Sequence, residues 1–529
     1  MTRTLPAWIV FIGATVACAA PPSAPAAASA APAPAIDVVE LSATDIHDRL
    51  TSGALTSHTL TQAYLDRIAA IDDAGPRLDA VIELSPNALQ VADALDAERR
   101  SGKVRSSLHG IPILIKDNVD IAGMVNSAGS LALADHRPAQ DAFLVQRLRA
   151  AGAVILGKTN LSEWANFRST RSTSGWSSRG GQTKNPYVLD RNPCGSSSGT
   201  GTAIAASLAA IGVGTETDGS IICPAAVSGL VGLKPTVGLV SRRGIIPISI
   251  SQDTAGPMGR TVADVALLLN GLAAVDDQDP AGPAAATKIP SDYATFLKAD
   301  ALKGKRFGVL RQAITFHPDA AAAIEAAVAK IKGAGGDVVD ISIDSYDKWN
   351  DPEFEVLLYE FKDGLNTYLK ASGSGQTLES LIAWNKTNAA RTMPFFGQEI
   401  FERAQAKGPL SDAAYKKARD EARRLAGKDG LLGALDRHKL DAVVAASVSP
   451  AWPTDYVLGD HFVGAGYGMA AVAGTPSITV PVGASRGLPL GLLFMGRPYS
   501  EGDLLGFAYA LEQLTRARAK PEYRPTLTP

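Results

Sequence analysis

The sequence predicts one large α/β domain, in which helices surround a sheet. The chain has 529 residues, of which 46% are hydrophobic and 20% are charged, so it can bury a substantial core. Short apolar runs that end at Gly or Pro alternate with helix-like segments, which is typical of α/β folds. From Val38 onward the sequence has no long linker, repeat or charge block, which favours a single domain over residues 38–525.

Helices are expected to open this domain, and strands to follow. Residues 41–73 have helical periodicity, with five side chains expected to face inward: Ile46, Leu50, Leu60, Tyr64 and Ile68. The next apolar runs predict strands and the segments between them predict helices: strands at 111–115, 154–156 and 209–213, and helices at 142–150 and 202–209.

The second half of the chain is expected to add a helical layer and then complete the sheet. Residues 319–437 are predominantly helical in pattern, with long charged faces such as 412–425, and we expect them to border a cleft. Strand-like runs return near the end of the chain, at 442–446, 477–482 and 490–496.

The N-terminus predicts export. Arg3 precedes an apolar stretch over 7–17 that is long enough for a signal peptide and too short to span a bilayer, so residues 1–20 are interpreted as an export signal. The residues TVAC that end at Cys18 match a lipobox loosely, so a lipid anchor at Cys18 and ordinary cleavage both stay open. Residues 21–37 are rich in Ala, Pro and Ser and are interpreted as a tether. No later segment is apolar for long enough to cross a membrane, and we expect a periplasmic or secreted protein.

Charge and composition exclude several classes of protein. Lys and Arg total 51 against 53 for Asp and Glu, a net charge of -2, which argues against nucleic-acid binding. Three cysteines, Cys18, Cys194 and Cys223, exclude a disulfide-rich scaffold and a zinc site built on Cys pairs. The seven histidines are scattered singly, without metal-binding spacing.

One motif match is interpreted as false. Residues 152–159 read GAVILGKT and satisfy the P-loop pattern. Their variable positions are all apolar and favour a buried strand, whereas a phosphate cradle needs a loop with free amides. We therefore expect Lys158 to end a strand and not to bind a nucleotide.

Two serine-bearing loops are the strongest signal for chemistry. Residues 193–202 read PCGSSSGTGT and lead into a helix-like segment, while residues 214–224 read GTETDGSIICP. Backbone amides at such junctions suit an anion or an oxyanion, although a plain helix N-cap explains the first loop equally well.

A nucleophilic serine needs a base, and the sequence offers two kinds. GSSSG matches GxSxG around Ser197, so a triad with His438 or His461 has to be considered, but the preceding residues look like a loop where a nucleophile elbow needs a strand. Lysine serves as a base when burial lowers its pKa. Three lysines close apolar runs and are comparable by pattern: Lys116, Lys158 and Lys234.

The motifs resemble the amidase signature family over residues 41–514, and the resemblance implies a large mixed sheet surrounded by helices. The motif GIPILIKDN places the family's lysine at Lys116. CGSSSGTG places the family's bridging serine at Ser196, which follows a cis peptide from Gly195. GTETDGSIICPA places the nucleophile at Ser220. The resemblance further implies a Ser-Ser-Lys triad supported by Gly195 and Ser197. The N–H groups of Thr217, Asp218, Gly219 and Ser220 would form the oxyanion hole, and the reaction would need no metal or organic cofactor.

Departures from the family pattern point to a subclass. Many members have an arginine two or three residues after the nucleophile, where this chain has Ile222 and Cys223, and this disfavours substrates with a free carboxylate there. The variations are similar to those of the peptide amidase branch, which releases ammonia from C-terminally amidated peptides. Three alternatives stay open: an amidase or esterase for aryl, aliphatic or oligomeric amides, an amidotransferase subunit, and a non-catalytic surface-held binding protein. Cys194 and Cys223 are expected to be small buried packing residues, with a disulfide as the alternative.

Overall fold

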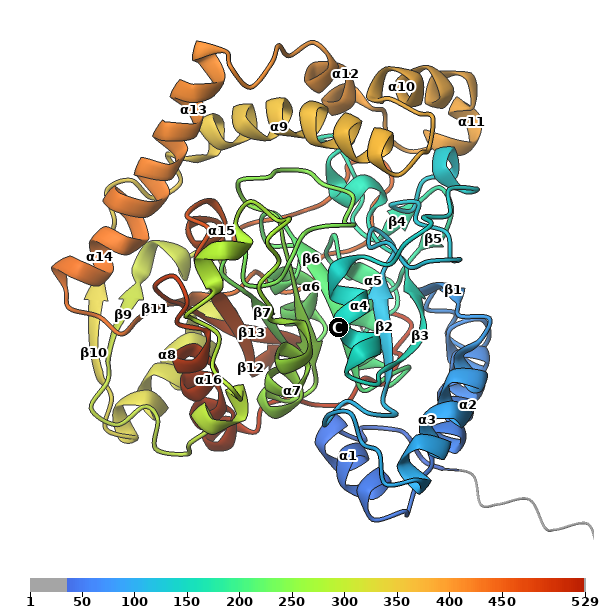
Figure 1. Ribbon diagram of the computed structural model, residues 1–529. Coiled ribbons are helices and arrows are strands. Elements are labelled where there is room, and N and C mark those ends of the chain that lie inside the picture. The colour runs from blue at the N-terminus through green and yellow to red at the C-terminus, as the bar shows by residue number, and fades with distance from the viewer. Residues whose placement is uncertain (1–35, 528–529) are drawn as a thin grey trace, which may run out of the picture. The chain divides into compact units, whose positions relative to one another are not determined.

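The computed structural model describes residues 36–527, whose centre is a mixed sheet of eleven strands in the order β1-β3-β2-β6-β8-β7-β12-β13-β11-β9-β10 (Figure 1). Its strands are β1 (Val81–Leu84), β2 (Pro112–Lys116), β3 (Val154–Thr159), β6 (Ile211–Glu216), β7 (Val231–Lys234), β8 (Thr254–Gly259), β9 (Arg306–Leu310), β10 (Asp337–Ile341), β11 (Ala442–Ala446), β12 (Ser477–Ser485) and β13 (Leu488–Met495). A separate hairpin pairs β4 (Trp176–Ser177) with β5 (Gly181–Gln182). The mixed sheet and the single large domain agree with the predicted fold class.

Helices surround this sheet. They are α1 (Ala43–Thr51), α2 (Ser57–Ile71), α3 (Ala88–Arg100), α4 (Phe143–Ala150), α5 (Ser198–Ala205), α6 (Ile222–Val227), α7 (Val262–Leu272), α8 (Pro318–Gly333), α9 (Asn350–Ala371), α10 (Leu378–Thr387), α11 (Ala389–Thr392), α12 (Glu399–Gln405), α13 (Ala413–Arg423), α14 (Leu432–Arg437), α15 (Gly468–Val472) and α16 (Glu501–Thr515). Short 3-10 or π segments are η1 (Leu131–Leu133), η2 (Glu163–Asn166), η3 (Gly282–Ala285), η4 (Tyr293–Phe296), η5 (Arg311–Ala313) and η6 (Arg424–Leu431).

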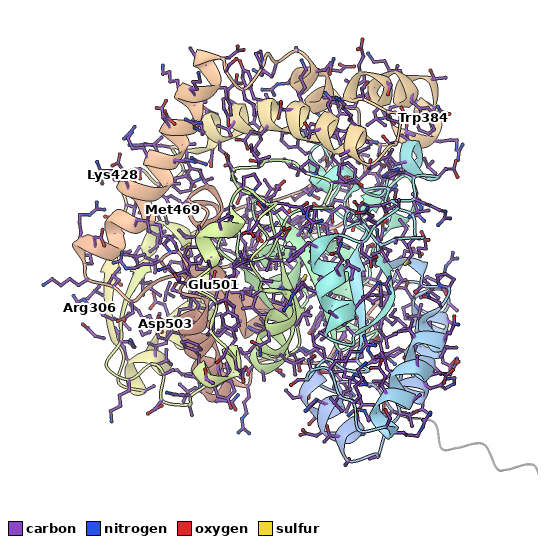
Figure 2. All side chains as sticks on the ribbon, viewed as in Figure 1. Arg306, Trp384, Lys428, Met469, Glu501 and Asp503 are labelled. Carbon is purple, nitrogen blue, oxygen red and sulfur yellow. A yellow bond between two sulfur atoms is a disulfide. The ribbon has the colours of Figure 1, made fainter. Side chains whose placement is uncertain are left out.

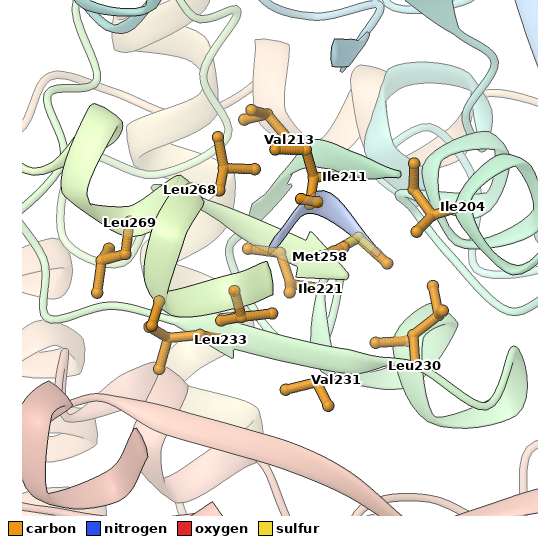
Figure 3. Close-up of a cluster of buried hydrophobic side chains, with 14 of the residues drawn as sticks. Ile204, Ile211, Val213, Ile221, Leu230, Val231, Leu233, Met258, Leu268 and Leu269 are labelled. Carbon is orange, nitrogen blue, oxygen red and sulfur yellow. The ribbon is translucent and has the colours of Figure 1, made fainter. Parts of the chain in front are cut away.

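Strand β8 shows that helices cover both faces of the sheet. A Cβ placed on Gly256 would lie 3.0 Å from Ile221 Cδ1, next to α6, and one on Gly259 would lie 2.9 Å from Asp264 Cβ in α7. Residues three apart in a strand point to opposite faces, so α6 and α7 lie on opposite sides. Figure 3 shows part of the resulting core, where apolar side chains of β6, β7 and β8 meet those of α5 and α7.

The N-terminal helices confirm the sequence periodicity, and all five side chains expected to face inward are buried. The boundaries around the first serine loop were predicted wrongly. Helix α5 begins at Ser198, inside the Gly/Ser run, and β6 begins only at Ile211. A Cβ on Gly199 would lie 2.4 Å from the carbonyl oxygens of Ala80 and Asn160, so the glycine lets the first turn of the helix pack directly against backbone.

The predicted helical region is confirmed with one interruption. Strand β10 lies between α8 and α9, and the helices from α9 to α14 then form a layer along one side of the molecule (Figure 1). Trp384 and Lys428 lie at the outer edge of this layer (Figure 2). None of the helices within residues 36–527 is both long and apolar enough to cross a membrane. The predicted export signal and nearly all of the predicted tether lie outside the described residues.

Candidate active site

The functional side chains meet at one edge of the sheet because neighbouring parallel strands end there. Strands β3, β2 and β6 run parallel, and Lys116 and Thr215 lie at the carboxyl ends of β2 and β6. Strand β8 runs antiparallel to β6, so its first residue, Thr254, pairs with Glu216 and brings the preceding Asp253 to the same edge. The sheet topology alone therefore gathers a lysine and two carboxylates.

Lys116 is fully buried and contacts the first serine loop. Its Nζ donates to Ser196 Oγ at 2.7 Å and to Thr215 at 2.9 Å for the side-chain oxygen and 3.2 Å for the carbonyl oxygen. Burial lowers the pKa of Lys116 to about 7, while the carboxylates of Glu216 and Asp253 oppose this shift. A substantial fraction of this amine is therefore neutral near pH 7.

The loop that carries Ser196 is held by short backbone contacts. The peptide from Gly195 to Ser196 is cis, as the family resemblance implies. The Ser196 carbonyl accepts from the Ser162 N–H at 3.1 Å, and a Cβ on Gly195 would lie 2.1 Å from Ser162 Oγ. Ser197 Oγ donates to the Thr215 carbonyl at 3.1 Å, which ties this loop to the end of β6.

The loop that carries Ser220 turns sharply between β6 and α6. Gly219 has φ +76°, and a Cβ there would lie 2.2 Å from Tyr467 Cε2, so only glycine fits. Glu216 Oε2 accepts from the N–H groups of Ile221 and Ile222 at 2.7 and 2.9 Å, which fixes the start of α6.

The two serine loops lie side by side through their backbones. The Ser197 N–H donates to the Ser220 carbonyl at 3.1 Å. The hydrogen bonds of residues 36–527 include none between the hydroxyls of Ser196 and Ser220. The structure thus brings Lys116 and Ser196 into direct contact and places Ser220 next to them without a hydroxyl–hydroxyl bond.

A disulfide joins Cys194 to Cys223, which corrects the expectation that both are free packing residues. Cys194 precedes the cis peptide and Cys223 lies in α6, so the bond connects the two serine loops. The sequence separation is 29, but the Cα atoms are 6.0 Å apart, because the loops meet at the sheet edge.

The alternative bases have structural roles. Lys158 is buried within β3, where its Nζ lies 3.1 Å from Asp117 Oδ1 and donates to the Val119 carbonyl at 2.7 Å. Lys234 is buried in β7 and donates to the Pro235 carbonyl at 3.1 Å. Residues 154–159 form β3, which confirms that GAVILGKT is not a phosphate cradle. His461 pairs with Asp455 at 2.9 Å and makes no hydrogen bond to Ser197.

The carboxyl groups of Glu216, Asp253 and Glu353 were missed from sequence, whereas Asp218 was among the predicted site residues. Thr217 donates to Asp253 Oδ1 at 2.6 Å, and burial raises the pKa of Asp253 to about 6. Burial and Glu216 raise the pKa of Asp218 to about 7, and burial together with Asp218 raises that of Glu353 in α9 well above its usual range. Glu216 could have been found from sequence, because it lies inside the motif GTETDGSIICP. Glu353 could not, because it lies in the distant helical layer and no motif surrounds it. Residues 36–527 contain no group of three or more His, Cys, Asp or Glu side chains that could hold a metal ion.

Comparison with known proteins shows the family of this chain. The family model described as Amidase matches residues 59–505. The chain belongs to the amidase family. It is an amide-hydrolysing enzyme, because its relatives in both sequence and structure are amidases. The native peptide amidase from Stenotrophomonas maltophilia is 52% identical with a TM-score of 0.90, covering 92% of this chain and 99% of that one.

The chain is also similar to two further proteins. A peptide amidase in complex with the competitive inhibitor chymostatin is 53% identical with a TM-score of 0.90, covering 92% of this chain and 100% of that one. A probable amidase from Arabidopsis thaliana is 38% identical, covering 92% of each chain.

Proposed function

We propose that this amidase hydrolyses the C-terminal carboxamides of peptides to the acid and ammonia through a Ser-Ser-Lys triad. The observation that carries the proposal is the contact of 2.7 Å between Lys116 Nζ and Ser196 Oγ in a fully buried setting. The likeness to peptide amidases, with identity of 52% and 53%, supports the substrate class.

In the proposed mechanism, Ser220 is the nucleophile. Neutral Lys116 accepts the proton of Ser196, which accepts the proton of Ser220 as Ser220 Oγ attacks the amide carbon. The Ser220 hydroxyl has to approach Ser196 when substrate binds, and such bonds often tighten only in the complex. The reverse relay protonates the leaving nitrogen, ammonia departs, and water cleaves the acyl-enzyme.

The oxyanion would be held by backbone N–H groups of Thr217, Asp218, Gly219 and Ser220. Two side-chain hydrogen bonds fix this turn. The Thr217 hydroxyl donates to Asp253, and Gln252 Nε2 donates to the Thr217 carbonyl at 3.3 Å. A fixed set of donors stabilises developing charge without reorganisation during the reaction.

The charge around Ser220 favours an amide over a free acid. Ile222 and Cys223, at the positions where many family members have an arginine, are buried, and Cys223 is in the disulfide. Asp218 and Glu353 lie nearby, and besides burial the negative charge of Asp218 disfavours the ionisation of Glu353. A substrate carboxylate would face the same repulsion, so a neutral terminal amide fits better.

Ammonia release from an amidated dipeptide tests the proposal. Wild-type protein should release ammonia, and Ser220→Ala should abolish the release. Ser228→Ala is a matched control, because Ser228 is also buried and its hydroxyl has no hydrogen-bond partner among the described residues. A Ser220→Ala variant with undiminished activity would refute the triad.

The other candidate functions are separated by two measurements. Higher kcat/KM for simple aryl or aliphatic amides than for peptide amides would favour a general amidase. Failure of a fluorophosphonate probe to label Ser220 would favour a non-catalytic binding protein.

We also propose that the amidase is exported. The disulfide supports this, because such bonds persist in oxidising compartments outside the cytoplasm. Mass spectrometry of the mature protein tests it: a new N-terminus within the Ala-rich residues, or a lipid on Cys18, is expected, and an intact N-terminus contradicts it.

A further inference from the structure

The segment 456–463 exposes an unusual amount of apolar surface. Among residues 36–527, five of the large apolar side chains that face solvent lie in it: Tyr456 (38% exposed), Val457 (86%), Leu458 (71%), Phe462 (46%) and Val463 (58%). We call this segment the rim loop. Clustered apolar exposure on a protein surface indicates a binding site more often than isolated exposure does.

The apolar surface continues beyond the rim loop. The Tyr456 ring stacks on Phe395 with centroids 4.2 Å apart, and Phe395, itself 42% exposed, meets Trp176 edge-on at 5.5 Å. Phe395 precedes α12 in the helical layer, so the patch joins the C-terminal part of the chain to that layer.

One anchor of the rim loop reaches the Ser196 loop. Asp460 is partly buried and accepts from the Ser174 N–H at 3.0 Å and from Asn192 Nδ2 at 3.1 Å. Asn192 Oδ1 in turn accepts from the Cys194 N–H at 2.7 Å. Two hydrogen bonds thus connect the rim loop to the residue that precedes Gly195.

The segment that follows the rim loop reaches the Ser220 loop. Tyr467, four residues after Val463, lies against Gly219, as the distance of 2.2 Å from a Cβ placed there shows. These contacts connect the rim loop and the residues that follow it to both serine loops, and Ser220 retains 8% exposure.

The rim loop is also preorganised. Asp455 Oδ1 accepts from the N–H groups of Val457 at 2.8 Å and Leu458 at 3.0 Å, which holds the turn with both side chains outward. His461 bonds to the other oxygen of Asp455 at 2.9 Å. A fixed apolar surface loses little conformational entropy on binding a ligand.

We propose that the rim loop and Phe395 bind an apolar side chain upstream of the scissile terminal amide. The loop contains no Lys or Arg, which argues against an anionic membrane as its partner, and a neutral apolar peptide matches its chemistry. This inference rests on the proposed function and adds a preference for apolar residues in the acyl part of the substrate.

Kinetics on two substrates test the inference. In the double variant Val457→Ser/Leu458→Ser, kcat/KM for N-acetyl-leucyl-leucine amide should fall about tenfold or more. The fall should come from a higher KM, because the leucine side chain loses its apolar contact with the rim loop. On N-acetyl-diglycine amide the change should stay within about twofold, because glycine has no side chain to place on the rim loop. Leu458→Met should retain the preference, and Val104→Ser, at a position 48% exposed elsewhere, should change neither value.

The outcomes separate the inference from the proposed function. Hydrolysis of the diglycine amide by wild type establishes the proposed function independently of the rim loop. An equal fall on both substrates, or no change on either, overturns the inference alone. If wild type co-sediments with phosphatidylcholine vesicles and the double variant does not, while the kinetics are unchanged, the rim loop binds a membrane and the inference is also overturned. Inactivity of wild type on both amides would refute the proposed function together with the inference.

Discussion

Lys116 can act as a base only because the fold hides it from water. Its side chain is fully buried, and both nearby carboxylates, Glu216 and Asp253, have raised pKa values themselves. An amine that was ion-paired to a fully charged carboxylate would keep its proton. Burial is therefore the main cause of the lowered pKa of Lys116, and it outweighs the opposing effect of the two carboxylates.

The pH dependence of the reaction follows from this pKa. Protonated Lys116 cannot accept a proton, so kcat/KM should rise about tenfold per pH unit below about pH 7 and level off above it. Lys116→Met should reduce kcat by at least about a thousandfold at all pH values, as loss of a triad member does. Rates measured from pH 5 to 9 check both expectations, and a flat wild-type profile would contradict the neutral-lysine mechanism.

Gly219 is a second residue with a specific requirement. Gly219→Ala should nearly abolish activity, because the new Cβ would lie 2.2 Å from the Tyr467 ring and shift the oxyanion turn. Gly53→Ala is a matched control, since Gly53 has the same φ of +76° with nothing within 4 Å of its Cβ. Both variants should lose about 1 kcal/mol of stability from backbone strain. Equal kinetics in the two variants would contradict the role of the turn.

The disulfide connects α6 to the loop that enters α5, and so holds the two serine loops together. It closes a loop with a separation of 29 residues, which in the chain-entropy model stabilises the fold by roughly 3–4 kcal/mol. Cys194→Ser/Cys223→Ser should lower Tm by several degrees and reduce kcat as the loops separate. A reductant should lower the Tm of wild type and leave that of the double variant unchanged; an unchanged wild-type Tm would contradict the structural role of the bond.

Sequence reasoning succeeded where the signal was local. The run GIPILIK predicts both a buried strand and a shielded lysine, and β2 with Lys116 at its end confirms this. It failed where partners come from distant elements. Tyr467 contacts Gly219 because of how the C-terminal part of the chain packs, and Glu353 comes near Asp218 because of how the helical layer packs. The hydrophobic periodicity of the sequence does not predict either packing. The disulfide was underestimated for the same reason, because loop proximity follows from sheet order.

Across the whole molecule, one carboxylate ties the helical layer to the site. Glu360 in α9 accepts hydrogen bonds from the Ser249 hydroxyl, the Ser251 N–H at 3.0 Å and Tyr415 of α13 at 2.6 Å. The Ser249 carbonyl accepts from the Asp253 N–H at 2.9 Å, so Glu360 lies one short loop away from a residue of the site. The helical layer thus positions one wall of the active site from outside the sheet.

Glu360→Gln should weaken this connection. An amide replaces one acceptor oxygen with a donor, which leaves a buried hydroxyl or N–H unsatisfied and costs about 2–3 kcal/mol. Because the loop before Asp253 loosens, KM should rise more than kcat falls. Glu355→Gln on the same helix is the control: Glu355 pairs with Lys407 at 2.6 Å near the surface, and its loss should cost less than about 1 kcal/mol. Thermal denaturation and steady-state kinetics on the same amide distinguish the two variants. If both shift Tm and KM equally, the helical layer stabilises the fold without shaping the site.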